Sequence, residues 1–114
     1  MWTQCPALSP KFWIQRTNGK LYWNTQVHAT LNFPTFVDLW FDSEEQRIGV
    51  TSGTRHSVLQ EEDSFCIMAK EDLQYFGMSF PLDSTKEYLL KSVSTDLPYN
   101  GILTVYYFDL DEPL

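Results

Sequence analysis

The sequence lacks long apolar runs and any leader-like N-terminal segment. No stretch approaches the ~20 apolar residues that a membrane-spanning helix needs. Residues 1–11 contain no basic segment followed by an apolar run, and residues 1–10 are predicted to form an extended arm. No Asn-x-Ser/Thr acceptor for N-glycosylation occurs. We therefore expect a cytoplasmic protein, located in the host cytoplasm if a phage encodes it.

The motifs of the common enzyme classes are also absent. There is no glycine-rich phosphate loop, no HExxH or CxxC motif and no Gly-x-Ser-x-Gly nucleophile elbow. The sequence predicts that His28 is a partly buried structural residue and that His56 is exposed in a polar loop. Together with Cys5 and Cys66 they do not have the spacing of a zinc motif. We expect a protein that is not an enzyme, with no cofactor and no bound metal.

Cysteine and basic charge are both scarce. Two cysteines make no disulfide framework, and Cys66 is expected to be a buried, reduced thiol. The net charge is −7, and it is unevenly distributed: all 15 acidic residues lie in residues 38–114, whereas residues 1–37 carry only bases. Phosphate attraction supplies most of the non-specific affinity for nucleic acid, so the overall acidity disfavours a nucleic-acid-binding protein.

Aromatic residues are abundant, at 16% of the 114 residues, and they favour strands. Residues 12–17 and 20–23 are predicted to form a hairpin through a two-residue Asn18-Gly19 turn, which pairs Arg16 with Leu21. The two faces of this hairpin differ in character. The apolar face carries Phe12, Ile14, Leu21 and Trp23, and the opposite face carries Trp13, Gln15, Lys20 and Tyr22.

A short helix and a second hairpin follow. Asn24 is expected to cap a helix over residues 25–31, and Pro34 prevents its extension. Residues 36–42 and 47–51 predict a hairpin with a four-residue loop, which places Trp40 opposite Gly49. The predicted core face of this hairpin holds Val37, Leu39, Phe41, Ile48 and Val50.

The second half of the chain predicts a mixture of elements. Strands are expected at residues 56–60, 64–69, 78–80 and 102–108, and a helical turn at 71–76 that Gly77 ends. Ser84 and Glu87 have capping-box spacing and predict a helix over residues 84–94. We expect a mainly β fold with two short helices, arranged as a small barrel in one domain, 1–114. It divides into a first β-helix-β-hairpin unit at 1–51, a polar connection at 52–63 and a second unit at 64–114.

The first unit resembles the swapped-hairpin β-barrel family of AbrB-like transition-state regulators and MazE-like antitoxins. The resemblance covers about residues 12–51, although Phe36-Val37 stands where the family has Gly-Asp. It implies a swapped-hairpin-like pseudo-dimer within one chain, with DNA contacts at Arg16 and Lys20. The matching positions are Gly19, Lys20, Leu21, Tyr22, Trp23, Asn24, Leu31, Phe33, Leu39 and Phe41.

Three functions remain open. The first is a regulator or inhibitor of phage or mobile-element origin that binds a protein partner, because small acidic proteins without catalytic motifs serve in this way. Its candidate contact residues are Trp13, Tyr22, Trp40, Asp109, Asp111 and Glu112. The second is an AbrB-like DNA-binding regulator or antitoxin, which could act as a homodimer and would use Lys11, Arg16 and Lys20. The third is an acidic DNA mimic.

Overall fold

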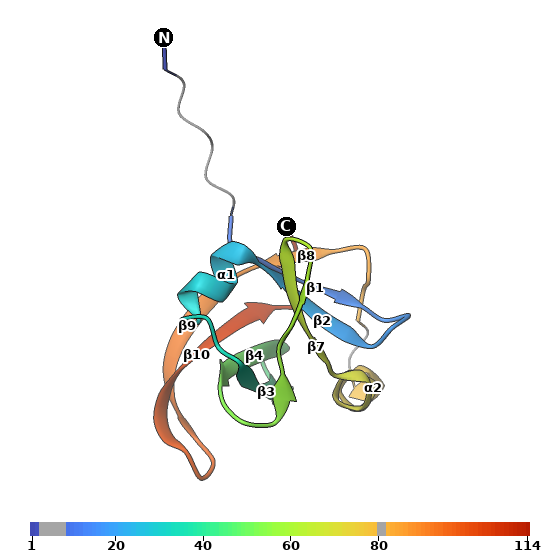
Figure 1. The fold of residues 1–114 in the computed structure, drawn as a ribbon. Helices are drawn as coiled ribbons and strands as arrows, with labels where there is room; N and C mark the ends of the chain where they lie inside the picture. The colour runs from blue at the N-terminus through green and yellow to red at the C-terminus, as the bar shows by residue number, and fades with distance from the viewer. Residues whose placement is uncertain (3–8, 80–81) are drawn as a thin grey trace.

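Two five-stranded antiparallel sheets and two helices make up the structure, a computed structural model that describes residues 1–2, 9–79 and 82–114 (Figure 1). Sheet A has the strand order β6-β7-β2-β1-β8, and sheet B the order β5-β3-β4-β10-β9. The predicted mainly β class with two helices is confirmed, but the sheets do not close into the predicted barrel. The predicted arm lies largely outside the described residues, as does Cys5.

The elements have the following bounds. Sheet A contains β1 (Lys11–Gln15), β2 (Lys20–Asn24), β6 (Leu59–Glu61), β7 (Ser64–Met68) and β8 (Glu87–Leu89). Sheet B contains β3 (Phe36–Asp42), β4 (Arg47–Ser52), β5 (His56–Ser57), β9 (Lys91–Leu97) and β10 (Gly101–Asp109). The helices are α1 (Thr25–Thr30) and α2 (Lys70–Ser79).

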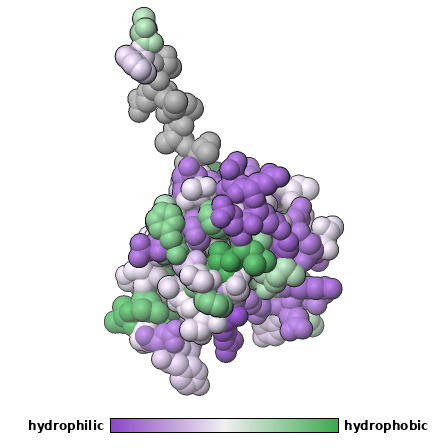
Figure 2. Space-filling view, viewed as in Figure 1, coloured by the Kyte–Doolittle hydropathy of each residue, from purple (hydrophilic) through white to green (hydrophobic). Residues whose placement is uncertain are grey.

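Apolar side chains remain on the surface in separate patches among hydrophilic ones, as Figure 2 shows for one face. The end of the β9–β10 hairpin carries such side chains, with Ile102 77% exposed. β10 pairs with β4 only from Tyr106 onward, whereas it pairs with β9 from Gly101 onward. The distal part of this hairpin therefore extends beyond β4 as a two-stranded ribbon.

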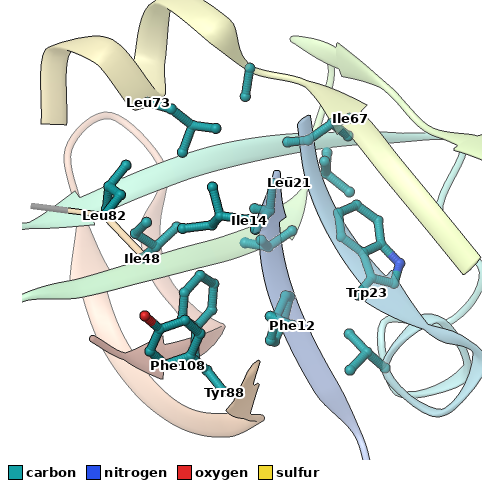
Figure 3. Packing of buried hydrophobic residues seen from close by; sticks show 14 of the residues in the cluster. Phe12, Ile14, Leu21, Trp23, Ile48, Ile67, Leu73, Leu82, Tyr88 and Phe108 are labelled. Atoms are coloured by element: carbon teal, nitrogen blue, oxygen red, sulfur yellow. The ribbon is translucent and has the colours of Figure 1, made fainter. Parts of the chain in front are cut away.

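The core lies between the two sheets, where side chains from both gather (Figure 3). Phe12 of sheet A stacks on Phe108 of sheet B with ring centroids 4.8 Å apart, and both side chains are fully buried. Burial of one such side chain stabilises the fold by about 1.5–3 kcal/mol. Helix α2 contributes Phe76, whose ring stacks on Phe41 at 4.6 Å.

The register of the first hairpin differs from the prediction, although its faces do not. Ile14 pairs with Leu21, so four residues, not two, connect the strands. Gly19 has φ +68°, but Asn18 does not have the positive φ that a type I′ turn requires. The Asn18 side chain instead donates to Gln15 Oε1 at 2.7 Å and accepts from the Lys20 N–H at 3.1 Å, which stabilises the longer loop. A shift of two residues preserves the alternation, so the predicted apolar face is the buried one.

The helix α1 and the second hairpin are confirmed. Asn24 caps α1 by accepting a hydrogen bond from the Val27 N–H at 3.2 Å. β3 and β4 pair in the predicted register, with Trp40 opposite Gly49. The predicted strands at 64–69 and 102–108 are confirmed as β7 and β10, and the one at 56–60 is split into β5 and β6.

The helix predicted over residues 84–94 is wrong. β8 and β9 occupy this segment, and β8 pairs with β1. Ser84 does not cap a helix, since its hydroxyl accepts from the Arg16 N–H at 3.1 Å, far away in sequence. Tyr88, at 2% exposure, is buried on the inner side of β8, and this burial outweighs the local helix signal.

Helix α2 is longer than the predicted turn, continuing through Gly77 to Ser79. Leu73 and Phe76 are buried on one side of it, so packing on the core sustains the helix past the glycine. The strand predicted at 78–80 is therefore wrong at Met78 and Ser79, and Phe80 lies outside the described residues. Each sheet combines strands from residues 1–51 with strands from residues 52–114.

Candidate protein-binding surface

The outer face of sheet B carries a row of four residues, two of them aromatic, that crosses four strands. Trp40 of β3 lies opposite Gly49 of β4, Gly49 opposite Tyr107 of β10, and Tyr107 opposite Lys91 of β9. Side chains alternate along a strand, so all four residues belong to the face that points away from the core. The two aromatic side chains therefore stand on either side of a residue that has none.

Gly49 is required here by close packing, not by its backbone angles. A Cβ atom at this position would lie 2.5 Å from Cγ1 of Val105, which is 6% exposed. Val105 thus fills the space above the glycine backbone and forms the floor between Trp40 and Tyr107.

This floor belongs to a groove of about 500 Å³. One wall is the end of β3 with the β3–β4 loop, where Asp42 and Glu44 lie. The other is the ribbon of β9 and β10, which contributes Val93, Leu97 and Pro98. The groove therefore has an apolar floor and wall with carboxylates at one margin.

Hydrogen bonds and charge contacts orient the aromatic side chains. Trp40 donates from Nε1 to Oγ1 of Thr51 at 2.9 Å. The Arg47 guanidinium lies 4.7 Å from the centre of the Tyr107 ring, in a cation–π contact. Arg47 also donates to Asp109 at 2.9 Å, and this hydrogen bond raises the pKa of Arg47 above its ordinary value. Contacts within the chain therefore hold both rings in place.

Of the predicted protein-binding residues, Asp109 forms ion pairs within the chain. Its carboxylate binds Arg47 and also accepts from Lys91 Nζ at 2.7 Å. Burial raises the pKa of Asp109, but the hydrogen bonds from Lys91 and Arg47 outweigh it and hold the pKa below its usual range. Glu112 also pairs with Lys91, and the Gln46 amide lies against Asp111. The acidic tail is thus largely occupied by contacts within the chain.

Trp13 and Tyr22 lie on the other outer face, that of sheet A. Their rings stack with centroids 5.5 Å apart, and Tyr22 donates from its hydroxyl to Glu61 at 2.6 Å. Burial raises the pKa of Tyr22. Cys66 pairs with Tyr22 and is fully buried, as predicted, and burial raises the pKa of its thiol. The structure therefore separates Trp40 from the Trp13–Tyr22 stack on opposite sides of the molecule.

The predicted DNA-contacting residues all have partners within the chain. Lys11 forms an ion pair with Glu87 at 2.8 Å, and Lys20 forms one with Glu61 at 2.6 Å. The hydrogen bond to Glu61 raises the pKa of Lys20. Arg16 donates to the Leu82 carbonyl at 3.2 Å. The basic hairpin is thus largely neutralised by acids from later in the sequence.

The histidines hold structure in place. His28 is buried, as predicted; it accepts from Trp23 Nε1 at 3.2 Å and stacks on Phe65 at 3.6 Å. Burial lowers its pKa. The expectation that His56 is exposed is wrong: its side chain is only 16% exposed and lies 3.4 Å from Asp72. Among the described residues, no cluster of three or more His, Cys, Asp or Glu is placed to hold a metal ion.

The sequence did not identify Tyr107, Val93 and Leu97 as site residues. Alternation along 103–107 would place Tyr107 opposite the core face of its strand, which is a usable signal. For Val93 and Leu97 the sequence offers no such signal, because the local pattern predicts a helix that includes Val93 and ends before Leu97.

Comparisons with known proteins add no relative. No protein-family model, no curated protein and no solved structure matches the chain significantly. In the described ranges, none of the helices has the length and apolar character needed to cross a membrane.

Proposed function

We propose that this protein is a regulator or inhibitor that acts by binding a protein partner in the groove on the outer face of sheet B. The observation that carries the proposal is the alignment of Trp40 and Tyr107 in one row around Gly49. Aromatic side chains that are held in place and partly exposed are the residues that anchor protein interfaces. No catalytic group enters the proposal.

The charges around the groove favour a basic partner segment. Asp42 and Glu44 lie at its margin, and no ion pair within the described residues engages either of them. Arg47 and Lys91 are already paired with carboxylates. The partner surface that fits is therefore an apolar or aromatic anchor flanked by lysine or arginine.

Protein binding ranks above DNA binding because of the ion pairs of the first hairpin. A phosphate would have to displace Glu87 from Lys11 and Glu61 from Lys20 before it gained either charge. Three bases would in any case neutralise few phosphates. A DNA mimic ranks lower still, since Asp109 and Glu112 are engaged with Lys91.

Selection from a displayed peptide library tests the proposal. The wild-type chain serves as bait, and the affinity of each selected peptide is then measured for the wild type and for Trp40→Ala. Selected peptides should contain an apolar anchor with flanking basic residues. Trp40→Ala should weaken their binding at least ~30-fold, as for an interface hot spot.

Trp13→Ala is the matched control, because Trp13 is also a half-buried tryptophan on an outer sheet face. This variant should bind the peptides like the wild type, with both variants verified as folded by circular dichroism. Peptides that depend on Trp13 and not on Trp40 would refute the groove assignment. Salt-sensitive retention of DNA that disappears in the double variant Arg16→Ala, Lys20→Ala would support the DNA-binding regulator instead.

A further inference from the structure

The open edge of β9 is the longest unpaired strand edge among the described residues. The other three edge strands, β5, β6 and β8, contain two or three residues each, whereas β9 contains seven. Proteins usually protect an edge by keeping it short or by placing a proline, a bulge or a charge in it. β9 pairs with β10 without a bulge, and its centre, residues 92–95, holds no charge and no proline. In Figure 1, β9 lies at the rim of the molecule.

The backbone direction along β9 identifies the groups that remain free at this edge. The Leu97 carbonyl accepts from the Asn100 N–H at 3.1 Å, so Leu97 points its backbone groups into the hairpin. In an antiparallel pair this direction alternates from one residue to the next. Ser92, Ser94 and Asp96 therefore direct their N–H and C=O groups outward.

We propose that a second copy of the chain covers this edge, through antiparallel pairing of the two β9 strands about a twofold axis at Ser94. In this register Ser94 faces Ser94 of the other copy, and Ser92 faces Asp96. The outward backbone groups of these three residues then pair with one another and form a continuous ladder of six hydrogen bonds. Such an isologous contact joins the two B sheets edge to edge.

The side chains of β9 suit self-pairing. Hydroxyls of Ser92 meet the Asp96 carboxylates, and on the groove face Val93 meets Thr95, both of them good strand formers. Lys91 faces Leu97, so no like charges oppose each other. The sequence of β9 is thus complementary to itself in this register, with no like charges opposed and a hydroxyl opposite each Asp96 carboxylate, which is why we assign the edge to a second copy.

Interfaces built on one strand edge are small, so the dimer should be concentration-dependent. In a sedimentation series the wild-type mass should rise from 13.3 kDa toward twice that value. Ser94→Pro should stay monomeric, because it removes an outward N–H and leaves the β10 hydrogen bonds intact. Ser94→Thr, which keeps the N–H, should dimerise like the wild type. A wild type that is monomeric throughout, or a Ser94→Pro that dimerises, overturns the proposal.

A charge-complementation experiment tests the twofold axis itself and does not depend on the proline variant. Ser94→Lys and Ser94→Glu should each be monomeric, because like charges would face each other across the axis. An equimolar mixture of the two should recover the dimer. If the mixture remains monomeric, the Ser94 register is refuted. The peptide-binding test of the groove can be performed on the monomeric variants, so the two proposals can fail separately.

Discussion

Gly49 offers the sharpest test of how the candidate groove is built. In Gly49→Ala the new methyl group would be placed 2.5 Å from Cγ1 of Val105, far inside van der Waals contact. Gly49 does not have a positive φ, so the expected effect is overpacking and not backbone strain. Overpacking of a well-packed site destabilises a protein by about 1–3 kcal/mol.

The compensating variant is Val105→Ala. Alone it removes two buried methyl groups and should destabilise the protein by about 1.5 kcal/mol. In the double variant the new methyl group at position 49 occupies space that the Val105 side chain has vacated, so the two losses should not add. We expect the double variant to be more stable than the sum of the single effects predicts, by at least about 1 kcal/mol.

Urea unfolding followed by far-UV circular dichroism measures all four proteins of this cycle. With a slope of about 1–3 kcal/mol per molar urea, a loss of 2 kcal/mol moves the midpoint by roughly 1 M. Additivity within about 0.5 kcal/mol would refute the packing of Val105 over Gly49. It would also remove the reason for placing the groove floor there.

Two further predictions concern titrating groups. Burial lowers the pKa of His28 in the folded protein, so on acidification the unfolded chain takes up a proton on this imidazole first. The free energy of unfolding should therefore decline as the pH falls below about 6.5, the pKa of histidine in an unfolded chain. In His28→Gln this decline should be shallower, as measured by urea midpoints from about pH 7.5 to 5.5. Asp109→Asn should lower the free energy of unfolding by about 1–2 kcal/mol at pH 7. It should also remove the part of the wild-type loss of stability in acid that begins below about pH 4. Asp111→Asn should change the stability little, and equal effects of the two variants would contradict the structural role of Asp109.

The two hairpins show which part of the fold the sequence specifies. In the second, the pairing of Trp40 with Gly49 and of Asp42 with Arg47 agrees with the alternation of apolar residues, so one register satisfies every requirement. In the first, registers that differ by two residues bury the same face. The hydrogen bonds of the Asn18 side chain decide between them, and a dipeptide turn rule does not contain that information.

The segment 84–94 shows where local patterns fail. Ser84 and Glu87 match a capping box, yet Glu87 pairs with Trp13, more than 70 residues earlier. Such a long-range contact is invisible in a local window, and it brings Tyr88 into the core. The local helix signal of this segment conceals β9, and with it one wall of the groove. Trp40 could be predicted as a site residue because its own hairpin could, whereas Val93 and Leu97 of the facing wall could not.

Contacts within the fold compensate much of the uneven charge of the sequence. The bases of residues 1–37 contact Glu61, Leu82 and Glu87, all from later segments. The acids left without such partners include Asp42 and Glu44 at the groove on sheet B. Edge pairing through β9 would set two such grooves on one continuous sheet, since Val93 belongs both to the groove wall and to the paired strand. A partner with two basic segments could then engage both grooves at once, and its affinity would rise through effective concentration without any new contact.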